Sequence, residues 1–70
     1  MRVSYNRLWK KLIDLNLKRY QLREMAHISN NTMAKLGKNE FVNLEILSKI
    51  CECLDCDIED VCQFVKDSDI

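Results

Sequence analysis

The sequence contains no proline and a single glycine, so the residues that most often interrupt helices are almost absent. It also has no apolar run near the roughly 20 residues that a membrane-spanning helix needs. Residues 1–4 lack the hydrophobic region and the cleavage site of a secretory signal. We therefore expect a chain of 70 residues with 31% charged side chains to be a single soluble domain in the cytoplasm, with no membrane partner.

Groups that carry catalysis are equally scarce. The one histidine, His27, has no catalytic partner that the sequence identifies. There is no glycine-rich phosphate loop, no nucleophile–base motif and no cluster of acidic metal ligands. His27 is better explained as a turn residue, and we expect no enzymatic activity, no cofactor and no small-molecule ligand.

The four cysteines lie within twelve positions of one another, at Cys51, Cys53, Cys56 and Cys62. A disulfide scaffold would need an oxidising compartment, and these short loops would reach little of the fold. The spacing does not match the paired ligands typical of a zinc site. Free thiols packed in the core are therefore favoured over metal ligands, and Cys53 or Cys56 could be an exposed, oxidisable thiol.

The formal net charge of zero hides a sharp division along the chain. Residues 1–38 carry nine basic and two acidic side chains, a net charge of +7, and residues 39–70 carry two basic and nine acidic ones, a net charge of −7. Such asymmetry is typical of a protein whose basic end contacts nucleic acid or a membrane surface. Two solvated faces of opposite sign would give the same totals.

Apolar spacing predicts helices almost throughout and no strand of useful length. We expect helices over residues 5–14, 19–26, 30–36, 43–54 and 57–65, with a frayed tail over residues 66–70. Ser29, Asn43 and Asp57 are suited to cap three of these helices, and Gly37 to end the third in a left-handed conformation. The side chains expected to face inward are Tyr5, Leu8, Trp9, Leu12, Ile13, Leu22, Met25, Ala26, Met33, Leu36, Leu44, Leu47, Ile50, Cys51, Leu54, Ile58, Val61, Cys62 and Val65.

The most informative segment is residues 19–36, two short helices joined by a tight turn. The second helix opens with four small polar residues, Ser29 to Thr32. In a major groove, an asparagine can pair with adenine and a threonine can contact the thymine methyl group, while the free N–H groups of the helix favour a phosphate. Basic side chains that suit phosphate contacts surround this segment, namely Lys18, Arg19, Lys35 and Lys38.

Residues 22–37, with the sequence LREMAHISNNTMAKLG, resemble the helix-turn-helix core of the Cro and lambda-repressor-like (XRE-type) DNA-binding domains. Residues 43–51 and 54–60 resemble the fourth and fifth helices of small bacterial and phage regulators in that group. The resemblance covers residues 5–65. It implies an all-α, five-helix lambda-repressor-like domain whose second and third helices form the helix-turn-helix.

The resemblance also implies a function, the sequence-specific binding of double-stranded DNA by a transcriptional regulator that inserts its third helix into the major groove. Base readout is expected from Asn30, Asn31, Thr32 and Lys35, and phosphate contacts from Lys18, Arg19, Ser29 and Lys38. A homodimer formed through the C-terminal helices is implied as well. The sequence offers Phe64, Val65 and Ile70 as apolar contacts for it.

Two residues depart from the family pattern. Arg23 stands where a small residue usually lets the two helices pack, and His27 stands where the turn usually has a glycine. The stem of Arg23 is expected to pack while its charged head reaches water, and histidine is among the residues enriched at positive φ. These departures favour an alternative function, a protein-interaction module of the antitoxin or anti-repressor kind with weak or no DNA binding.

Overall fold

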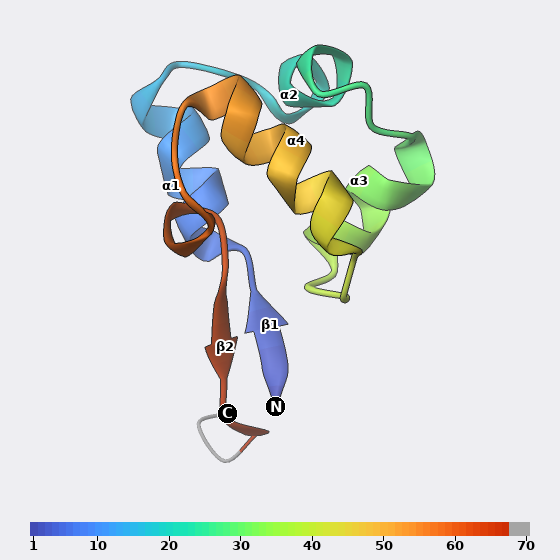
Figure 1. Ribbon diagram of the computed structural model, residues 1–70, viewed down its shortest axis with the longest axis vertical. Coiled ribbons are helices and arrows are strands. Elements are labelled where there is room, and N and C mark those ends of the chain that lie inside the picture. The colour runs from blue at the N-terminus through green and yellow to red at the C-terminus, as the bar shows by residue number, and fades with distance from the viewer. Residues whose placement is uncertain (68–70) are drawn as a thin grey trace.

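The computed structural model describes residues 1–67, and in this range the chain forms four α-helices, one 3-10 turn and a two-stranded sheet. The helices gather into one body, from which the two strands extend toward the ends of the chain (Figure 1). None of the helices in the described range is long and apolar enough to cross a membrane. The elements are β1 (Arg2–Ser4), α1 (Asn6–Asp14), α2 (Arg19–Met25), α3 (Asn30–Gly37), α4 (Leu44–Leu54), η1 (Ile58–Asp60) and β2 (Gln63–Val65).

The core takes apolar side chains from all four helices and from both ends of the described chain. Leu8, Leu22, Leu36 and Ile50, one from each helix, are completely buried. Removing each from water contributes about 2 kcal/mol to folding, so the core fixes α2 and α3 against α1 and α4. The buried apolar residues are Val3, Tyr5, Leu8, Leu12, Leu22, Ala26, Ile28, Leu36, Leu47, Ile50, Leu54 and Val61.

The C-terminal part differs from the expected fifth helix. After Asp57, the chain makes one 3-10 turn and then extends as β2, which pairs antiparallel with β1 and places Phe64 opposite Val3. The chain is mostly helical, as expected, but the expected fifth helix was wrong, and two strands of three residues each form where no strand of useful length was expected. The apolar spacing of this segment suits a helix, but its β-branched and aromatic residues also suit a strand, and pairing with β1 decides between them.

The end of α3 also differs from expectation. Gly37 is the last helical residue and has no positive φ, whereas Asn39 takes the left-handed conformation with a φ of 57°. Asn39 accepts a hydrogen bond from the backbone N–H of Tyr5 at 3.2 Å, and the Tyr5 hydroxyl donates to the Glu40 carbonyl oxygen at 2.7 Å. These contacts fasten the loop after α3 to the start of α1, so the helix ends where the loop is held.

Several apolar residues that were expected to face inward are exposed. Ile13 and Leu44 are 75% and 68% exposed, and Met25 and Ile58 also lie on the surface. The reason is geometric, because a helix of two or three turns buries only the narrow stripe that faces its neighbours. Ile13 and Met25 lie in the last turns of α1 and α2, and Leu44 is the first residue of α4.

Asp67 belongs to the tail that was expected to fray. It forms ion pairs with the Met1 amino group at 3.6 Å and with Arg2 at 3.8 Å. These pairs join the start of β1 to the chain that follows β2, at the same end of the sheet. Ile70, which was expected to contribute to a dimer, lies outside the described residues.

Candidate nucleic-acid interface

In the turn between α2 and α3, His27 takes the left-handed conformation and ends α2. His27 has a φ of 55°, as expected for a residue that stands in for glycine. The N–H groups of His27 and Ile28 donate back to the carbonyl oxygens of Glu24 and Arg23, at 3.4 and 3.0 Å. This pair of bonds is the Schellman motif, which closes a helix and reverses the chain. Ile28 then enters the core and anchors the turn.

Ser29 caps α3, as the sequence predicts. Its hydroxyl oxygen accepts from the Thr32 N–H at 3.2 Å and lies 3.0 Å from the Thr32 hydroxyl. Both hydroxyl groups are thus engaged with each other, and Thr32 is half-buried. This arrangement fixes the first turn of α3, so the direction of the residues next to it is set by the helix itself.

The outer face of α3 is polar and unobstructed. Leu36 is fully buried and Met33 half-buried, so one side of the helix faces the core. The other side presents Asn30, Asn31 and Lys35, all exposed. Within residues 1–67 neither asparagine side chain forms a hydrogen bond to the protein. Their amide groups therefore remain available to an external ligand.

The four basic residues expected at phosphates are all exposed. They are Lys18, Arg19, Lys35 and Lys38. The ion pairs of the described chain involve only Met1, Arg2 and Arg23 as cations. The four therefore keep their charges free for an anion.

Arg19 is held in a defined position, unlike a solvated lysine. Its guanidinium carbon lies 3.8 Å from the centre of the Trp9 ring. One of its terminal nitrogens, Nη1, lies 3.5 Å from the point that a Cβ atom would occupy at Gly37. Trp9 is half-buried rather than a full core residue, and Arg19 covers one face of its ring.

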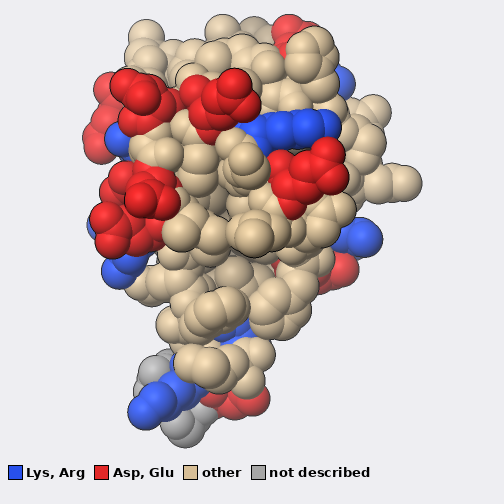
Figure 2. Space-filling model, viewed as in Figure 1, with Lys and Arg blue, Asp and Glu red and all other residues tan. Residues whose placement is uncertain are grey.

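Charge divides between two faces of the molecule. The segment from Lys18 to Lys38 holds five basic residues and one acidic residue, Glu24. Acidic side chains instead gather on the face that α4 presents in Figure 1, where Figure 2 shows several patches of Asp and Glu. A polyanion is attracted to the first surface and repelled by the second.

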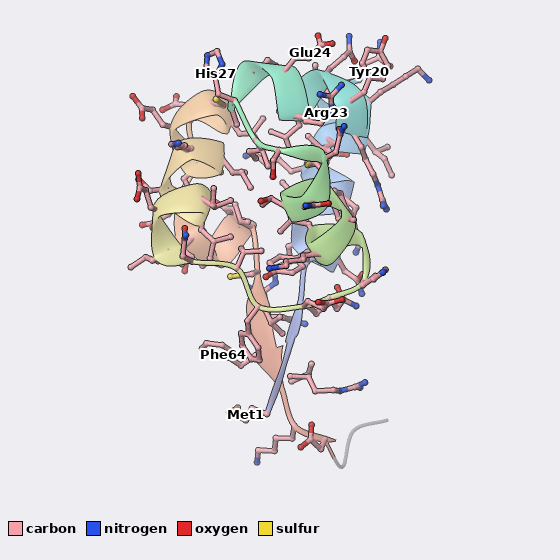
Figure 3. The ribbon with its side chains drawn as sticks, turned by 90° about the vertical axis from the view of Figure 1, so that its right-hand side faces the viewer. Met1, Tyr20, Arg23, Glu24, His27 and Phe64 are labelled. Carbon is pink, nitrogen blue, oxygen red and sulfur yellow. The ribbon has the colours of Figure 1, made fainter. Side chains whose placement is uncertain are left out.

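The two side chains that depart from the family pattern, Arg23 in α2 and His27 in the following turn, do not block α3. Figure 3 shows Tyr20 and Glu24 along the outer side of α2 and His27 beyond its end, whereas Arg23 lies on the side nearer α3. The Arg23 side chain is 34% exposed, and its Nη2 lies 4.0 Å from the Glu24 carboxylate. Its stem is covered and its head reaches the surface, as expected, so the two helices pack although neither residue is small.

The cysteines are free and half-buried. Cys51 and Cys56 meet at the end of α4, where the Cys56 N–H donates to the Cys51 carbonyl oxygen at 3.0 Å and Asp55 is left-handed. Burial, and then the neighbouring Cys56, raise the pKa of Cys51 to about 11. Burial also raises the pKa of Cys62. These thiols stay protonated at neutral pH, and no three potential metal ligands gather within residues 1–67.

Sequence reasoning missed a surface groove beside the sheet, with a volume of about 340 Å³. We call it the apolar groove. Phe41 and Phe64 flank it with ring centres 6.4 Å apart, and Leu44 stands at its edge. These three side chains are 60%, 65% and 68% exposed. The sequence predicts a surface contact for only one of these three residues, Phe64. Phe41 falls in an expected loop, and Leu44 was expected to face the core.

Comparison with known proteins agrees with this geometry. The model of the Cro/C1-type helix-turn-helix DNA-binding domain matches residues 7–67. A crystal structure of the transcriptional regulator VanUg (form II) is 52% identical to this chain, with a TM-score of 0.92. The match covers 94% of this chain and 88% of that one. Comparison with curated proteins gives no significant match.

Proposed function

The chain belongs to the Cro/C1-type helix-turn-helix DNA-binding domain family, and from this premise we propose that it is a sequence-specific transcriptional regulator that reads double-stranded DNA with α3 in the major groove. The regulator VanUg, with 52% identity over nearly the whole chain, supports a regulatory role.

The observation that carries the proposal is the free polar face of α3. Asn30, Asn31 and Lys35 are exposed on one side of a helix whose other side is held in the core. An asparagine amide can form two hydrogen bonds with adenine, and a lysine can bind guanine or a phosphate. Thr32 is half-buried and bonded to Ser29, so we expect its contribution to be its methyl group or the rigidity of the first turn.

Phosphate contacts set the orientation on DNA in this proposal. Lys18 and Arg19 lie at the start of α2, and Ser29 and Lys38 flank α3 at its two ends. Contacts at both ends of a recognition helix fix how deep and at what angle it enters the groove, without reading sequence. The acidic face over α4 would point away from the duplex.

We further propose that the regulator acts as a homodimer. One helix of eight residues reads only a few base pairs, so a specific site calls for two half-sites about one helical turn apart. The surface that supports dimerisation is the apolar groove, which is lined by residues of α4, η1 and β2, among them Leu44, Ile58 and Phe64. Phe64 lies at this groove, whereas Val65 points to the opposite face of the two-stranded sheet, since side chains alternate along a strand.

Selection of bound duplexes from random DNA, followed by anisotropy titration of the selected site, tests the function. We expect a palindromic site and an affinity that falls steeply with salt. With four phosphate contacts per recognition helix and two helices in the dimer, the loss between 50 and 200 mM salt is on the order of ten-thousandfold. No enrichment of any sequence, together with no retention on heparin at low salt, would contradict the proposal and favour the protein-interaction module instead.

A further inference from the structure

The guanidinium group of Arg19, on α2, lies close to residues of two other helices. It lies over the ring of Trp9 on α1, at 3.8 Å from the ring centre. An arginine in this position is attracted by the negative face of the indole ring and also stacks on it as a flat group. The Trp9 ring is half-buried against the core, so it offers a fixed platform.

Gly37 is the second residue close to the guanidinium group. It is the last residue of α3, and a Cβ atom placed there would lie 3.5 Å from Nη1 of Arg19. A methyl group at that distance is an ordinary contact, but a longer side chain would compete with the guanidinium for space. Gly37 has no positive φ, so the backbone itself does not call for glycine at this position.

The N–H groups of the Arg19 guanidinium are free to bind a ligand. In the described part of the chain, its guanidinium forms neither an ion pair nor a hydrogen bond, although the side chain is exposed. Stacking uses the face of the guanidinium and leaves its N–H groups, which lie in its plane, free at the edge. Two parallel N–H groups match the spacing of two oxygens on a phosphate.

We propose that Trp9 and Gly37 are positioning residues that hold the Arg19 guanidinium ready to clamp one phosphate of the DNA beside α3. This inference rests on the proposed DNA binding. A surface arginine normally loses side-chain freedom when it binds, and an arginine already stacked loses less. The stack also ties α1, α2 and the end of α3 to the same phosphate, so the clamp fixes the helix-turn-helix against the duplex.

A double-mutant cycle on DNA affinity tests the clamp. We expect Arg19→Ala to weaken binding about tenfold per half-site and to reduce the salt slope by about one for each protomer of the dimer, about two in all. Trp9→Leu should weaken binding by about threefold to tenfold, and the double variant should bind no worse than Arg19→Ala alone. Trp9→Phe keeps an aromatic face and should retain most of the affinity.

Lys18→Ala supplies the matched control, because Lys18 is a neighbouring exposed base at the start of α2 without an aromatic platform. Its loss should add to that of Trp9→Leu. If the losses from Arg19→Ala and Trp9→Leu also add, Trp9 does not act through Arg19 and the inference is wrong.

Gly37 gives an approach that leaves the core untouched, which matters if Trp9→Leu does not fold. Gly37→Ala should bind DNA like the wild type, whereas Gly37→Leu should push the guanidinium aside and match the loss of Trp9→Leu. Equal affinity of Gly37→Leu and the wild type would overturn the role given to Gly37.

The emission of Trp9 reads the stack directly, because it is the single tryptophan of the chain. We expect Arg19→Ala to change this emission in the free protein, and DNA to change it in the wild type but not in Arg19→Ala. If wild-type protein binds no DNA, the proposed function fails while the emission still reports the stack. If DNA binds and the emission of the two proteins is the same, only the clamp fails.

Discussion

The α2–α3 pair and the two-stranded sheet lie at different ends of the molecule and present opposite kinds of surface (Figure 1). The helix pair exposes amides and free cations, among them Asn31 and Arg19. The sheet end exposes large apolar side chains, with Phe64 65% and Leu44 68% accessible. The first surface suits a polyanion that can be read by hydrogen bonds, and the second suits a protein partner that can bury apolar area.

The largest effect should come from the contact that builds the helix pair. Leu36→Ala removes a completely buried side chain of α3. We expect the free energy of unfolding to fall by about 2–5 kcal/mol, as is usual for buried leucines. Leu44→Ala, on the exposed apolar groove, should cost about 0.5 kcal/mol or less. Urea denaturation of both variants measures the two losses of stability. Equal losses would contradict the assignment of Leu36 to the core and of Leu44 to the surface.

The next effect concerns how the polar surface reads DNA. Asn31→Ala should weaken binding to the selected site by about 1–3 kcal/mol and leave binding to unrelated duplexes nearly unchanged. Anisotropy titrations with the two kinds of duplex measure this directly. An equal loss on both would mean that Asn31 contacts the backbone or only supports α3.

A charged side chain placed in the apolar groove tests whether this surface forms the dimer interface. Phe64→Glu should weaken self-association at least about tenfold, since it buries a carboxylate against an apolar partner. Ile13→Glu is the matched control, because Ile13 is 75% exposed on α1 and does not line the groove. Sedimentation equilibrium distinguishes the outcomes, and an unchanged association constant for Phe64→Glu would remove the groove from the interface.

The smallest effect is a pH dependence of stability from the half-buried thiols. Cys51 has a pKa of about 11 in the folded chain against an ordinary value of 9.0. Below pH 9 the thiol is protonated in both states, so its contribution is fully present. As the pH rises from 9 to 11, the unfolded chain ionises first and stability is lost. Burial of Cys62 and Tyr5 shifts their pKa values in the same direction.

Urea midpoints between pH 8 and 11 measure this decline. Cys51→Ala should give a shallower fall with pH than the wild type, whatever its stability at pH 8. The same slope in both proteins would show that Cys51 ionises alike in the folded and unfolded chains.

How far the sequence predicts each surface follows from the range of the contacts involved. The cap at Ser29, the cap at Asn43 and the turn at His27 depend on residues within a few positions, and all three are as expected. The exposed face of α3 follows from the buried position of Leu36 in the same helix. The candidate DNA surface was therefore largely predictable.

The sheet and the stack on Trp9 were not predictable in this way. Phe64 pairs with Val3 from the other end of the chain, and no local pattern shows that a partner strand exists. Arg19 meets Trp9 and the end of α3 only once three helices have packed. Local spacing therefore predicts a fifth helix at residues that form a strand once they pair with β1. It also gives no sign of the apolar groove.

Amide chemical shifts recorded while the selected duplex is added to the labelled protein show which surface of the protein contacts DNA. We expect the largest changes at Arg19, Asn30, Asn31 and Lys38, while the acidic residues Glu52 and Asp57 change little. The strongest changes along α4 and η1, with α3 unaffected, would contradict the proposed DNA interface.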